Sequence, residues 1–265
     1  MEFTRQIAEL LYQRKILLVH NSKPPSDSEY GWLKLPSTLN VIQDIHIEER
    51  VGLYGSRYIA SIGAPLGHGL CNIGSFSYSY SALPPGLRVG RYCSISNGLS
   101  FLDSHHPTNL LTTSAMTFRP HNELWADILR EAEIAGVGNW HIYDHLSFPV
   151  IGNDVWIGRD VVLAMGITIG DGAIIAANSV VTKDVAPYSL IAGNPGECKK
   201  TRFHNETVQR LLASRWWDKD PVAIARIFRS GLERSLDYLE NHGESIPPFI
   251  PKFVTFDGNG VRTDN

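Results

Sequence analysis

The sequence predicts a mainly β fold, a parallel β-helix of six-residue repeats with a long protruding loop and helical N- and C-terminal segments. Three observations point to this fold class. A six-residue period runs through residues 151–186, its phase reappears less regularly from Ile73 onward, and it fails between Phe101 and Val150. Near both ends of the chain the apolar residues have helical spacing. We therefore expect a solenoid that is interrupted once and covered at its ends.

The N-terminal segment, residues 1–38, is expected to be helical, because Ile7, Leu10 and Leu11 lie at helical spacing in TRQIAELLYQRKILL. The β-helix domain is expected over residues 39–202. Residues 40–72 alternate like strands without the six-residue period, so they are expected to supply irregular first edges.

The repeat itself consists of IGNDVW, IGRDVV, LAMGIT, IGDGAI, IAANSV and VTKDVA. The first position is always aliphatic: Ile151, Ile157, Leu163, Ile169, Ile175 and Val181. The fourth position always tolerates positive φ or forms a local turn: Asp154, Asp160, Gly166, Gly172, Asn178 and Asp184. A turn residue recurs too often for a helix or a long strand. Each hexad is therefore expected to form a short strand and a corner, and three such edges close one triangular coil.

Upstream hexads begin at Ile73, Val89, Ile95 and Phe101. The stretch at about 103–149 is expected to be a loop thrown out from the coil, and long ordered loops tend to carry function. Within it, NELWADILREAEIAGVG is expected to form a short helix capped by Asn122 and ending near Gly136.

The C-terminal segment, residues 203–265, is expected to be helical and to end in a tail. Asn205 can cap ETVQRLLASRWW, and Asp220 with Pro221 can open PVAIARIFRS. LERSLDYLENHG ends on a glycine, and the polar residues after Phe256 are the part of the chain most compatible with disorder. Trp216 and Trp217 are expected to anchor this segment on the solenoid.

Composition narrows the function classes. A formal net charge of -3 provides no broad basic surface for nucleic acid and no polybasic segment for a membrane. Three cysteines without a C-x-x-C pair indicate neither a disulfide framework nor a cysteine zinc site. The first residues lack the features of a signal peptide, and no apolar run approaches membrane-spanning length. A cytoplasmic protein with a small-molecule or sugar partner is expected.

Two adjacent histidines mark the point where the repeat fails. In the hexad that starts at Phe101, His105 occupies the fifth position and is expected to face the packed interior or a corner. His106 lies just beyond, where the chain leaves the coil. A neutral imidazole can remove a proton from a hydroxyl, which is otherwise a poor nucleophile. His106 is therefore the candidate general base, and His105 is the second choice.

Several stretches resemble the hexapeptide acyltransferases, in particular the xenobiotic (streptogramin and chloramphenicol) acetyltransferases and their polysaccharide O-acetyltransferase relatives. These stretches are IGNDVWIGRDVV, IGDGAIIAANSVVTKDVAPYSLIAGNP, KKTRF, RLLASRWWDKDP, and GRYCSISNGLSF followed by HHPTNLLTTSAMTF. The resemblance implies a left-handed β-helix and a homotrimer with active sites between neighbouring β-helices, along which acetyl-CoA lies. It also implies that the histidine at the start of the loop, here His106, takes the acceptor's proton.

The resemblance implies further site residues by position. The expected acetyl-CoA contacts are Arg159, Ala177, Thr182, Lys183, Lys199, Lys200 and Arg202. Glu197 stands where a sugar acetyltransferase branch has arginine, which leaves the phosphate contacts open. Thr112, Thr113 and Trp125 are candidates for acceptor contact, and Trp140 is a further aromatic in the loop. The alternative interpretation is that the hydroxyls satisfy a turn and that KKTRF is a solvated charge cluster.

The predicted function is acetyl transfer from acetyl-CoA to a hydroxyl of a sugar, either a surface polysaccharide or its precursor, because HPTNLLTTS resembles the polysaccharide relatives. The tail resembles the antibiotic branch, so a streptogramin or chloramphenicol acceptor is the alternative. A non-catalytic β-helix scaffold is the alternative of a different class. His141 and His145 are spaced like metal ligands on a helix, but their segment looks extended and precedes Pro149, so no metal is expected.

Overall fold

A computed structural model describes residues 1–21, 23–59, 69–133 and 147–264 of the chain. The chain divides into two compact units, Met1–Phe101 with Ser147–Asn265 and Leu102–Leu146. The first unit contains the stacked strands and the C-terminal helices, and the second contains the segment that interrupts the repeat. Trp140, His141 and His145 lie outside the described residues, as does Gly136.

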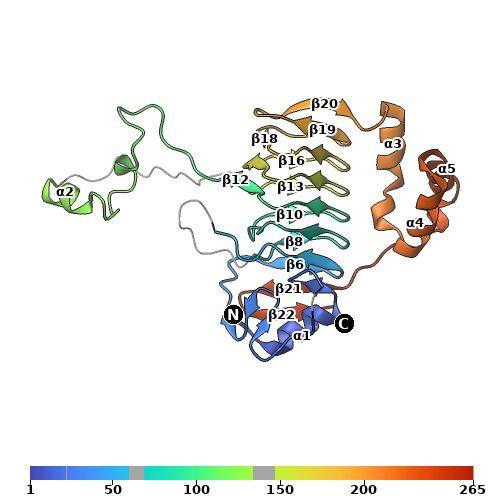
Figure 1. Ribbon diagram of the computed structural model, residues 1–265, viewed down its shortest axis with the longest axis horizontal. Coiled ribbons are helices and arrows are strands. Elements are labelled where there is room, and N and C mark those ends of the chain that lie inside the picture. Colours follow the sequence, from blue (N-terminus) through green and yellow to red (C-terminus); the bar gives the residue numbers. More distant parts are fainter. Residues whose placement is uncertain (22, 60–68, 134–146, 265) are drawn as a thin grey trace. The chain divides into compact units, whose positions relative to one another are not determined.

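Short strands stack in register to form three sheets of a parallel β-helix (Figure 1). One sheet contains β6 (Ile45–Glu48), β8 (Asn72–Ile73), β10 (Arg88–Val89), β13 (Val150–Ile151) and β16 (Thr168–Ile169). The second contains β2 (Ile16–Leu17), β7 (Val51–Leu53), β9 (Tyr78–Ser79), β11 (Ser94–Ile95), β14 (Trp156–Ile157), β17 (Ile174–Ile175), β19 (Ser189–Ala192) and β20 (Glu197–Thr201). The third contains β12 (Ser100–Leu102), β15 (Val162–Ala164) and β18 (Val180–Val181).

The position of a residue in the hexad determines whether it is buried in the core or lies at a corner. All six first-position aliphatics from Ile151 to Val181 are at most 2% exposed. The fourth positions from Asp154 to Asn178 adopt positive φ, between 54° and 75°, as the corner requires. Asp184 supports its corner differently, because its side chain accepts a hydrogen bond from the N–H of Thr168. The prediction of one buried aliphatic and one corner per hexad is confirmed.

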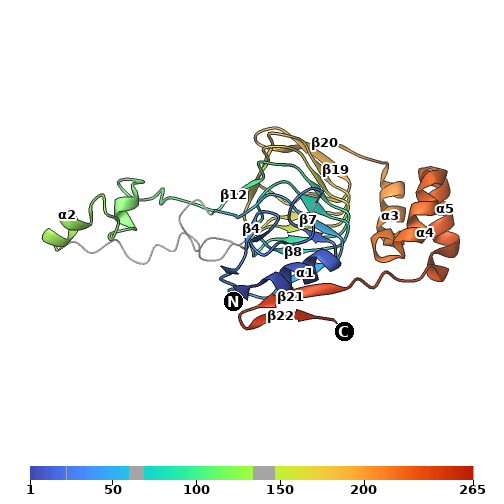
Figure 2. The same cartoon turned by 60° about the horizontal axis from the view of Figure 1, so that its bottom comes forward.

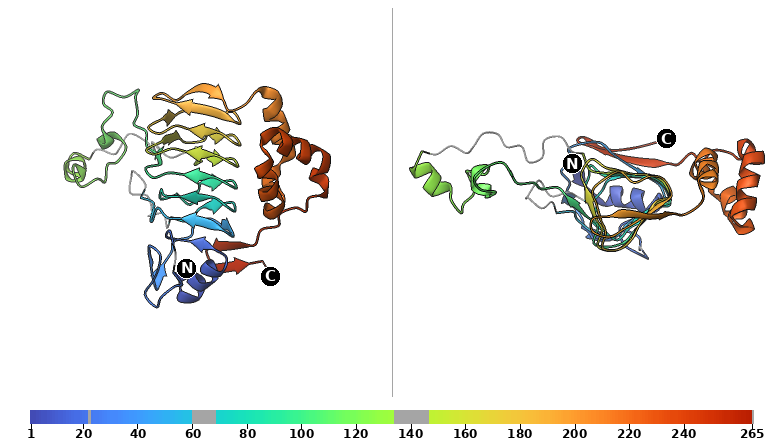
Figure 3. Two further views of the ribbon diagram at one scale, coloured as in Figure 1. Left: turned by 45° about the vertical axis from the view of Figure 1, so that its right-hand side comes forward. Right: turned by 90° about the horizontal axis from the view of Figure 1, so that it is seen from above.

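The N-terminal segment is less helical than the sequence predicts. Helix α1 (Arg5–Gln13) is followed by β2, which pairs in parallel with β7 and so supplies an edge of the β-helix. Three further strands follow outside the coil. β3 (Glu29–Tyr30) pairs antiparallel with β4 (Leu33–Lys34), and β5 (Ser37–Thr38) pairs antiparallel with β1 (Glu2–Phe3). Ala8 and Leu11 of α1 are buried in the same core as the coils, so this helix covers one end of the stack (Figure 3).

Three C-terminal helices pack beside the coils. They are α3 (Asn205–Ser214), α4 (Pro221–Ile227) and α5 (Leu232–His242). Asp220 caps α4 as predicted, whereas α3 already includes Asn205 and has His204 at its N-cap. Trp216 lies 4.7 Å from Tyr92, measured between ring centroids, and Trp217 is 4% exposed. The two tryptophans therefore anchor the helices on the solenoid, as the sequence predicts.

The polar tail after Phe256 is ordered, contrary to the sequence-based expectation. The chain returns from α5 to the first coils, where β21 (Phe253–Asp257) pairs antiparallel with β6 and then with β22 (Gly260–Thr263) (Figure 2). Phe256 is fully buried and stacks on Phe3. Pairing with β6 gives the polar tail hydrogen-bond partners and covers an open sheet edge. Within the described ranges, no helix is both long and apolar enough to cross a membrane.

Candidate active site

The strongest candidate for chemistry is His106 in the interrupting unit. Its imidazole is exposed, and Nδ1 lies 2.6 Å from the backbone carbonyl oxygen of Thr113. A carbonyl oxygen can only accept, so Nδ1 carries the proton in the neutral imidazole and Nε2 holds the free lone pair. The edge of the ring meets Phe118 at a centroid distance of 5.3 Å. Both contacts fix the ring, and the tautomer is the one that a general base needs.

The hydroxyl residues that follow support this turn. Thr112 accepts a hydrogen bond from the N–H of Ser114 through Oγ1, and Ser114 caps a short 3-10 helix at Ala115–Thr117. Thr113 acts through its backbone oxygen, a contact that its side-chain identity does not reveal. The hydroxyl run therefore builds the turn that orients His106.

Other residues of this unit differ from the sequence-based expectations. His105 is exposed and does not occupy a packed position, because the coil already ends at β12 and the hexad frame no longer applies. Helix α2 (Ala126–Glu131) starts four residues after Asn122, whose side chain instead accepts from the N–H of Leu124. Trp125 donates from Nε1 to the carbonyl of Arg119, so its indole also has a structural role.

In the first unit, the predicted cofactor residues Arg159 and Ala177 occupy one corner column of the coil. Gly98, Asp160 and Asn178 all adopt positive φ there, and the N–H of Asn178 donates to the carbonyl of Arg159. A Cβ atom on Gly158 would lie 2.6 Å from the backbone nitrogen of Ala177. The lack of a side chain at Gly158 is thus what lets these coils stack at this corner.

Thr182 and Lys183 lie at the other end of β18, at the opposite corner of the three-stranded sheet. The other edge strand of that sheet is β12, after which the chain leaves the coil for the unit that contains His106. Lys199 and Lys200 lie on β20 in the second sheet, and Lys199 pairs with Glu197 at 3.0 Å. The structure thus places Arg159, Ala177, Thr182 and Lys183 on the two flanks of the sheet β12–β15–β18, and Lys199 and Lys200 on β20.

Comparison with known proteins decides the family. A family model described as bacterial transferase hexapeptide (six repeats) matches residues 148–183. A probable macrolide acetyltransferase from Lysinibacillus sphaericus is 36% identical over 149 residues, which cover 54% of this chain and 76% of that protein. The chain belongs to the hexapeptide-repeat acyltransferase family. Membership implies the left-handed β-helix that the resemblance had suggested, in the xenobiotic acetyltransferase branch.

Other relatives of this hexapeptide-repeat protein match smaller shares of their length. A chloramphenicol acetyltransferase from Agrobacterium fabrum is 37% identical over 134 residues, 49% of this chain and 59% of the relative. A galactoside O-acetyltransferase from Escherichia coli is 51% identical over 61 residues, 23% of this chain and 29% of the relative. The chain therefore aligns with less than two thirds of the length of each of these two relatives.

Arg202, one of the predicted cofactor residues, makes hydrogen bonds within the protein. Arg202 donates from Nη1 to Asp154 Oδ2 at 3.0 Å and to the carbonyl of Gly172 at 2.7 Å. Its guanidinium also lies over the rings of Tyr188 and Phe203. Burial raises the pKa of Asp154, and the hydrogen bond and charge of Arg202 only partly offset this. Because Nη1 makes both hydrogen bonds and the charge of Arg202 faces Asp154, we expect Arg202 to have a structural role rather than the predicted cofactor contact.

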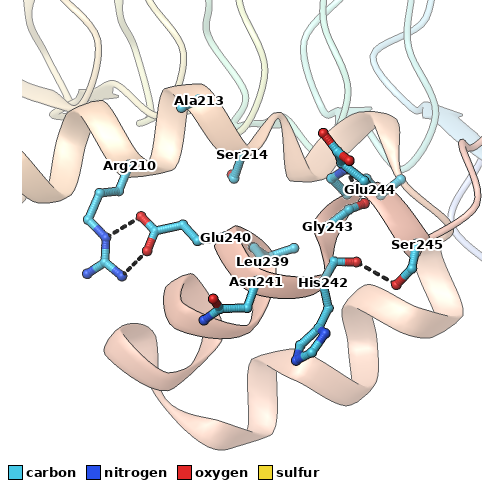
Figure 4. A pocket seen from close by; sticks show the side chains of 11 residues that line it. Arg210, Ala213, Ser214, Leu239, Glu240, Asn241, His242, Gly243, Glu244 and Ser245 are labelled. Atoms are coloured by element: carbon cyan, nitrogen blue, oxygen red, sulfur yellow. Dashed lines mark hydrogen bonds and ion pairs between the residues drawn. The ribbon is translucent and has the colours of Figure 1, made fainter.

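Other candidate sites in the described parts of the chain are weaker. A pocket of about 570 Å³ lies among the C-terminal helices, but Arg210 on its wall is paired with Glu240 (Figure 4). Arg210 also pairs with Asp237 and Glu233. Among described residues no group of three His, Cys, Asp or Glu side chains is arranged to hold a metal ion. Sequence reasoning missed Phe118 and the carbonyl of Thr113, since only the folded turn brings them to His106.

Proposed function

We propose that this chain is an acetyl-CoA-dependent O-acetyltransferase that acts on a hydroxyl of a sugar, with His106 as the general base. Family membership supports acyl transfer, and the hydrogen bond from Nδ1 of His106 to the Thr113 carbonyl is the observation that carries the assignment of the base. It leaves Nε2 unprotonated and holds the ring in place before the acceptor arrives.

The proposed reaction is a direct transfer. Nε2 of His106 takes the proton of the acceptor hydroxyl as the hydroxyl oxygen attacks the thioester carbonyl carbon. The tetrahedral intermediate then breaks its C–S bond, and the leaving thiolate takes the proton from the imidazolium. The products are an acetyl ester and free CoA, and the histidine returns to its neutral form without a covalent enzyme intermediate.

We further propose a homotrimer with active sites between neighbouring β-helices, in which acetyl-CoA lies along the flanks of the sheet β12–β15–β18. Arg159, Lys183 and Lys200 are exposed cations suited to its phosphates. The exposed small side chains of Ala177 and Thr182 leave room for the pantetheine chain. Lys199 shares its charge with Glu197 and would contribute less.

A second acceptor class is favoured by a specific finding. Relatives that match about half of this chain are named chloramphenicol and macrolide acetyltransferases, so an antibiotic hydroxyl is the alternative acceptor. Thiol release from acetyl-CoA, measured with neutral oligosaccharides, sugar nucleotides, streptogramin A and chloramphenicol, separates the two. A chain that binds no acyl-CoA at all would instead be a non-catalytic scaffold.

Replacing His106 tests the base. Asn can still donate a hydrogen bond to the Thr113 carbonyl, so His106→Asn should keep the turn while lowering kcat about 10²- to 10⁴-fold. His105→Asn is the matched control and should leave kcat near the wild-type value. Circular dichroism and sedimentation check the fold and the oligomer. Full activity of His106→Asn would refute the assignment, and selective loss in the control would transfer the role to His105.

A further inference from the structure

The C-terminal helices separate charges that lie close together in the sequence. Residues 226–240 contain three arginines and three acids, so this segment is neutral overall. Its acids, Glu233, Asp237 and Glu240, recur every three or four residues along α5 and therefore lie on one side of that helix. Arg210 on α3 pairs with all three at 2.6–2.9 Å. The acidic side of α5 is thus held towards α3.

A second pocket opens on another side of α5, where Arg234 and Tyr238 lie one turn apart. Its volume is about 460 Å³, and it shares no lining residue with the pocket in Figure 4. α4 and the 3-10 turn that follows it, Phe228–Ser230, supply further lining residues at helical spacing, so these share one face. We name this site the arginine pocket and define it by Arg226, Ile227, Ser230, Arg234, Tyr238 and Ile246.

The arginine pocket carries positive charge without a described counter-ion. Among the described residues that line it are two guanidinium groups and no carboxylate. α4 contains no acid, and the acids of α5 nearest to Arg234 are paired with Arg210. Two positive charges in one concave site raise the local concentration of anions. The pocket is therefore complementary to a negatively charged ligand.

Much of the remaining lining is apolar. Ile227 and Ile246 are only 9% and 8% exposed, so they lie deep in the pocket. The ring of Tyr238 is more accessible, because its side chain is 47% exposed. An inorganic anion on the arginines would leave these apolar surfaces in contact with water, whereas a ligand with an apolar group would cover them. The volume of the pocket suits a small molecule.

We propose that the arginine pocket binds an organic oxyanion that carries an apolar group. Guanidinium groups form paired, charge-assisted hydrogen bonds with carboxylate or phosphate oxygens, and the Ser230 hydroxyl supplies one more donor. Such an amphiphile is either a free molecule or the head of a phospholipid. A second copy of the chain fits less well, because a symmetric contact through this pocket would bring the arginines of both copies together.

The arginine pocket is separate from the site that we assign to acyl transfer. α5 lies on the far side of α3 from the coils (Figure 2). The sheet β12–β15–β18 and His106 contribute no residue to the lining. The inference therefore goes beyond the proposed function, and it stands or falls without a measurement of acetyl transfer.

Isothermal titration calorimetry on the wild-type protein tests the ligand class. Hexyl phosphate and hexanoate are compared with inorganic phosphate, which has the head alone, and with hexanol, which has the apolar group without charge. One of the two amphipathic anions should bind at least about tenfold more tightly than inorganic phosphate and hexanol. The proposal is wrong if neither amphipathic anion binds at about 10 mM, or if either partial probe binds as tightly.

Substitutions place the binding in the pocket. Arg226→Gln and Arg234→Gln should each weaken binding of the tighter anion about tenfold, as expected for a lost charge-assisted hydrogen bond at an exposed site. Arg229→Gln is the matched control, because Arg229 is an exposed arginine of the same segment that does not line the pocket. Circular dichroism checks the fold. An equal loss of affinity in Arg229→Gln would identify unspecific attraction and overturn the assignment.

Co-sedimentation with vesicles distinguishes the two sources of the ligand. Binding to phosphatidylglycerol vesicles and not to phosphatidylcholine vesicles, lost when Arg226→Gln and Arg234→Gln are combined but kept in Arg229→Gln, would assign the pocket to a phospholipid head. Binding of hexyl phosphate or hexanoate without vesicle binding would assign it to a free amphiphile. Vesicle binding that the combined variant retains, with no binding of either free anion, would refute the pocket as the site.

Discussion

Replacing Arg202 with Met should destabilise the fold without weakening acetyl-CoA binding. The resemblance to acyltransferases suggests that Arg202 contacts a cofactor phosphate, whereas its Nη1 donates to the Asp154 carboxylate and to the Gly172 carbonyl. Met keeps most of the volume of the side chain and removes the charge and the donors. The substitution therefore separates a structural role from a cofactor role.

The magnitude follows from the contacts that are lost. A hydrogen bond to a charged partner contributes about 1.5–3 kcal/mol, and the low end applies because the Arg202 and Asp154 side chains are 28% and 29% exposed. The bond to the Gly172 carbonyl contributes about 1 kcal/mol, and the contacts with the rings of Tyr188 and Phe203 about 0.5 kcal/mol. We expect the free energy of unfolding to fall by about 3 kcal/mol.

Part of the fall in the free energy of unfolding arises because Arg202→Met leaves the Asp154 carboxylate without its partner. Asp154→Asn is a suitable second variant, because asparagine tolerates the positive φ of 55° at this corner. The double variant should be about 1 kcal/mol more stable than Arg202→Met alone, since no buried carboxylate remains unpaired. Urea denaturation followed by circular dichroism measures all four proteins, and acetyl-CoA KM is determined in parallel. Unchanged stability with a tenfold higher acetyl-CoA KM would show that Arg202 is a phosphate ligand.

Two further substitutions test the coil. Burial raises the pKa of Glu48, but the hydrogen bonds and charge of Arg91 help to outweigh burial, so the folded pKa lies below the ordinary value. The stabilisation from Glu48 is then complete above the unfolded pKa of about 4.3 and is lost as pH falls through the lower folded pKa, so the stability difference between wild type and Glu48→Gln should stay constant above that pH and shrink below it. A difference that stays constant as the pH falls well below about 4.3 would contradict this. Gly158→Ala should lower the free energy of unfolding by about 1–3 kcal/mol and raise the acetyl-CoA KM, because its Cβ would force Ala177 outward. Gly258→Ala, which meets no atom closer than 3.9 Å, is the control, and equal effects of the two substitutions would refute the stacking argument.

The repeat made the solenoid predictable, because a buried aliphatic and a corner residue must recur wherever the chain turns. Each of the six first positions is in the core, and the irregular hexads at Ile73, Val89, Ile95 and Phe101 are buried as well. The same logic could not place Ile16–Leu17 or the tail after Phe256. Those segments join sheets through backbone hydrogen bonds to distant strands, and such pairing leaves little trace in local sequence.

The sequence by itself determined the coiled architecture, the family resemblance and the choice of His106 over His105 as the candidate base. Only the tertiary structure decided that Thr113 orients His106 through its backbone oxygen and that Asp154 engages Arg202. It also placed Arg226 and Arg234 around one pocket and turned the acids of α5 towards Arg210. Local periodicity specifies which side chains point inward, but the partner of each outward side chain comes from another coil or a returning segment, so its identity depends on the register of the stack.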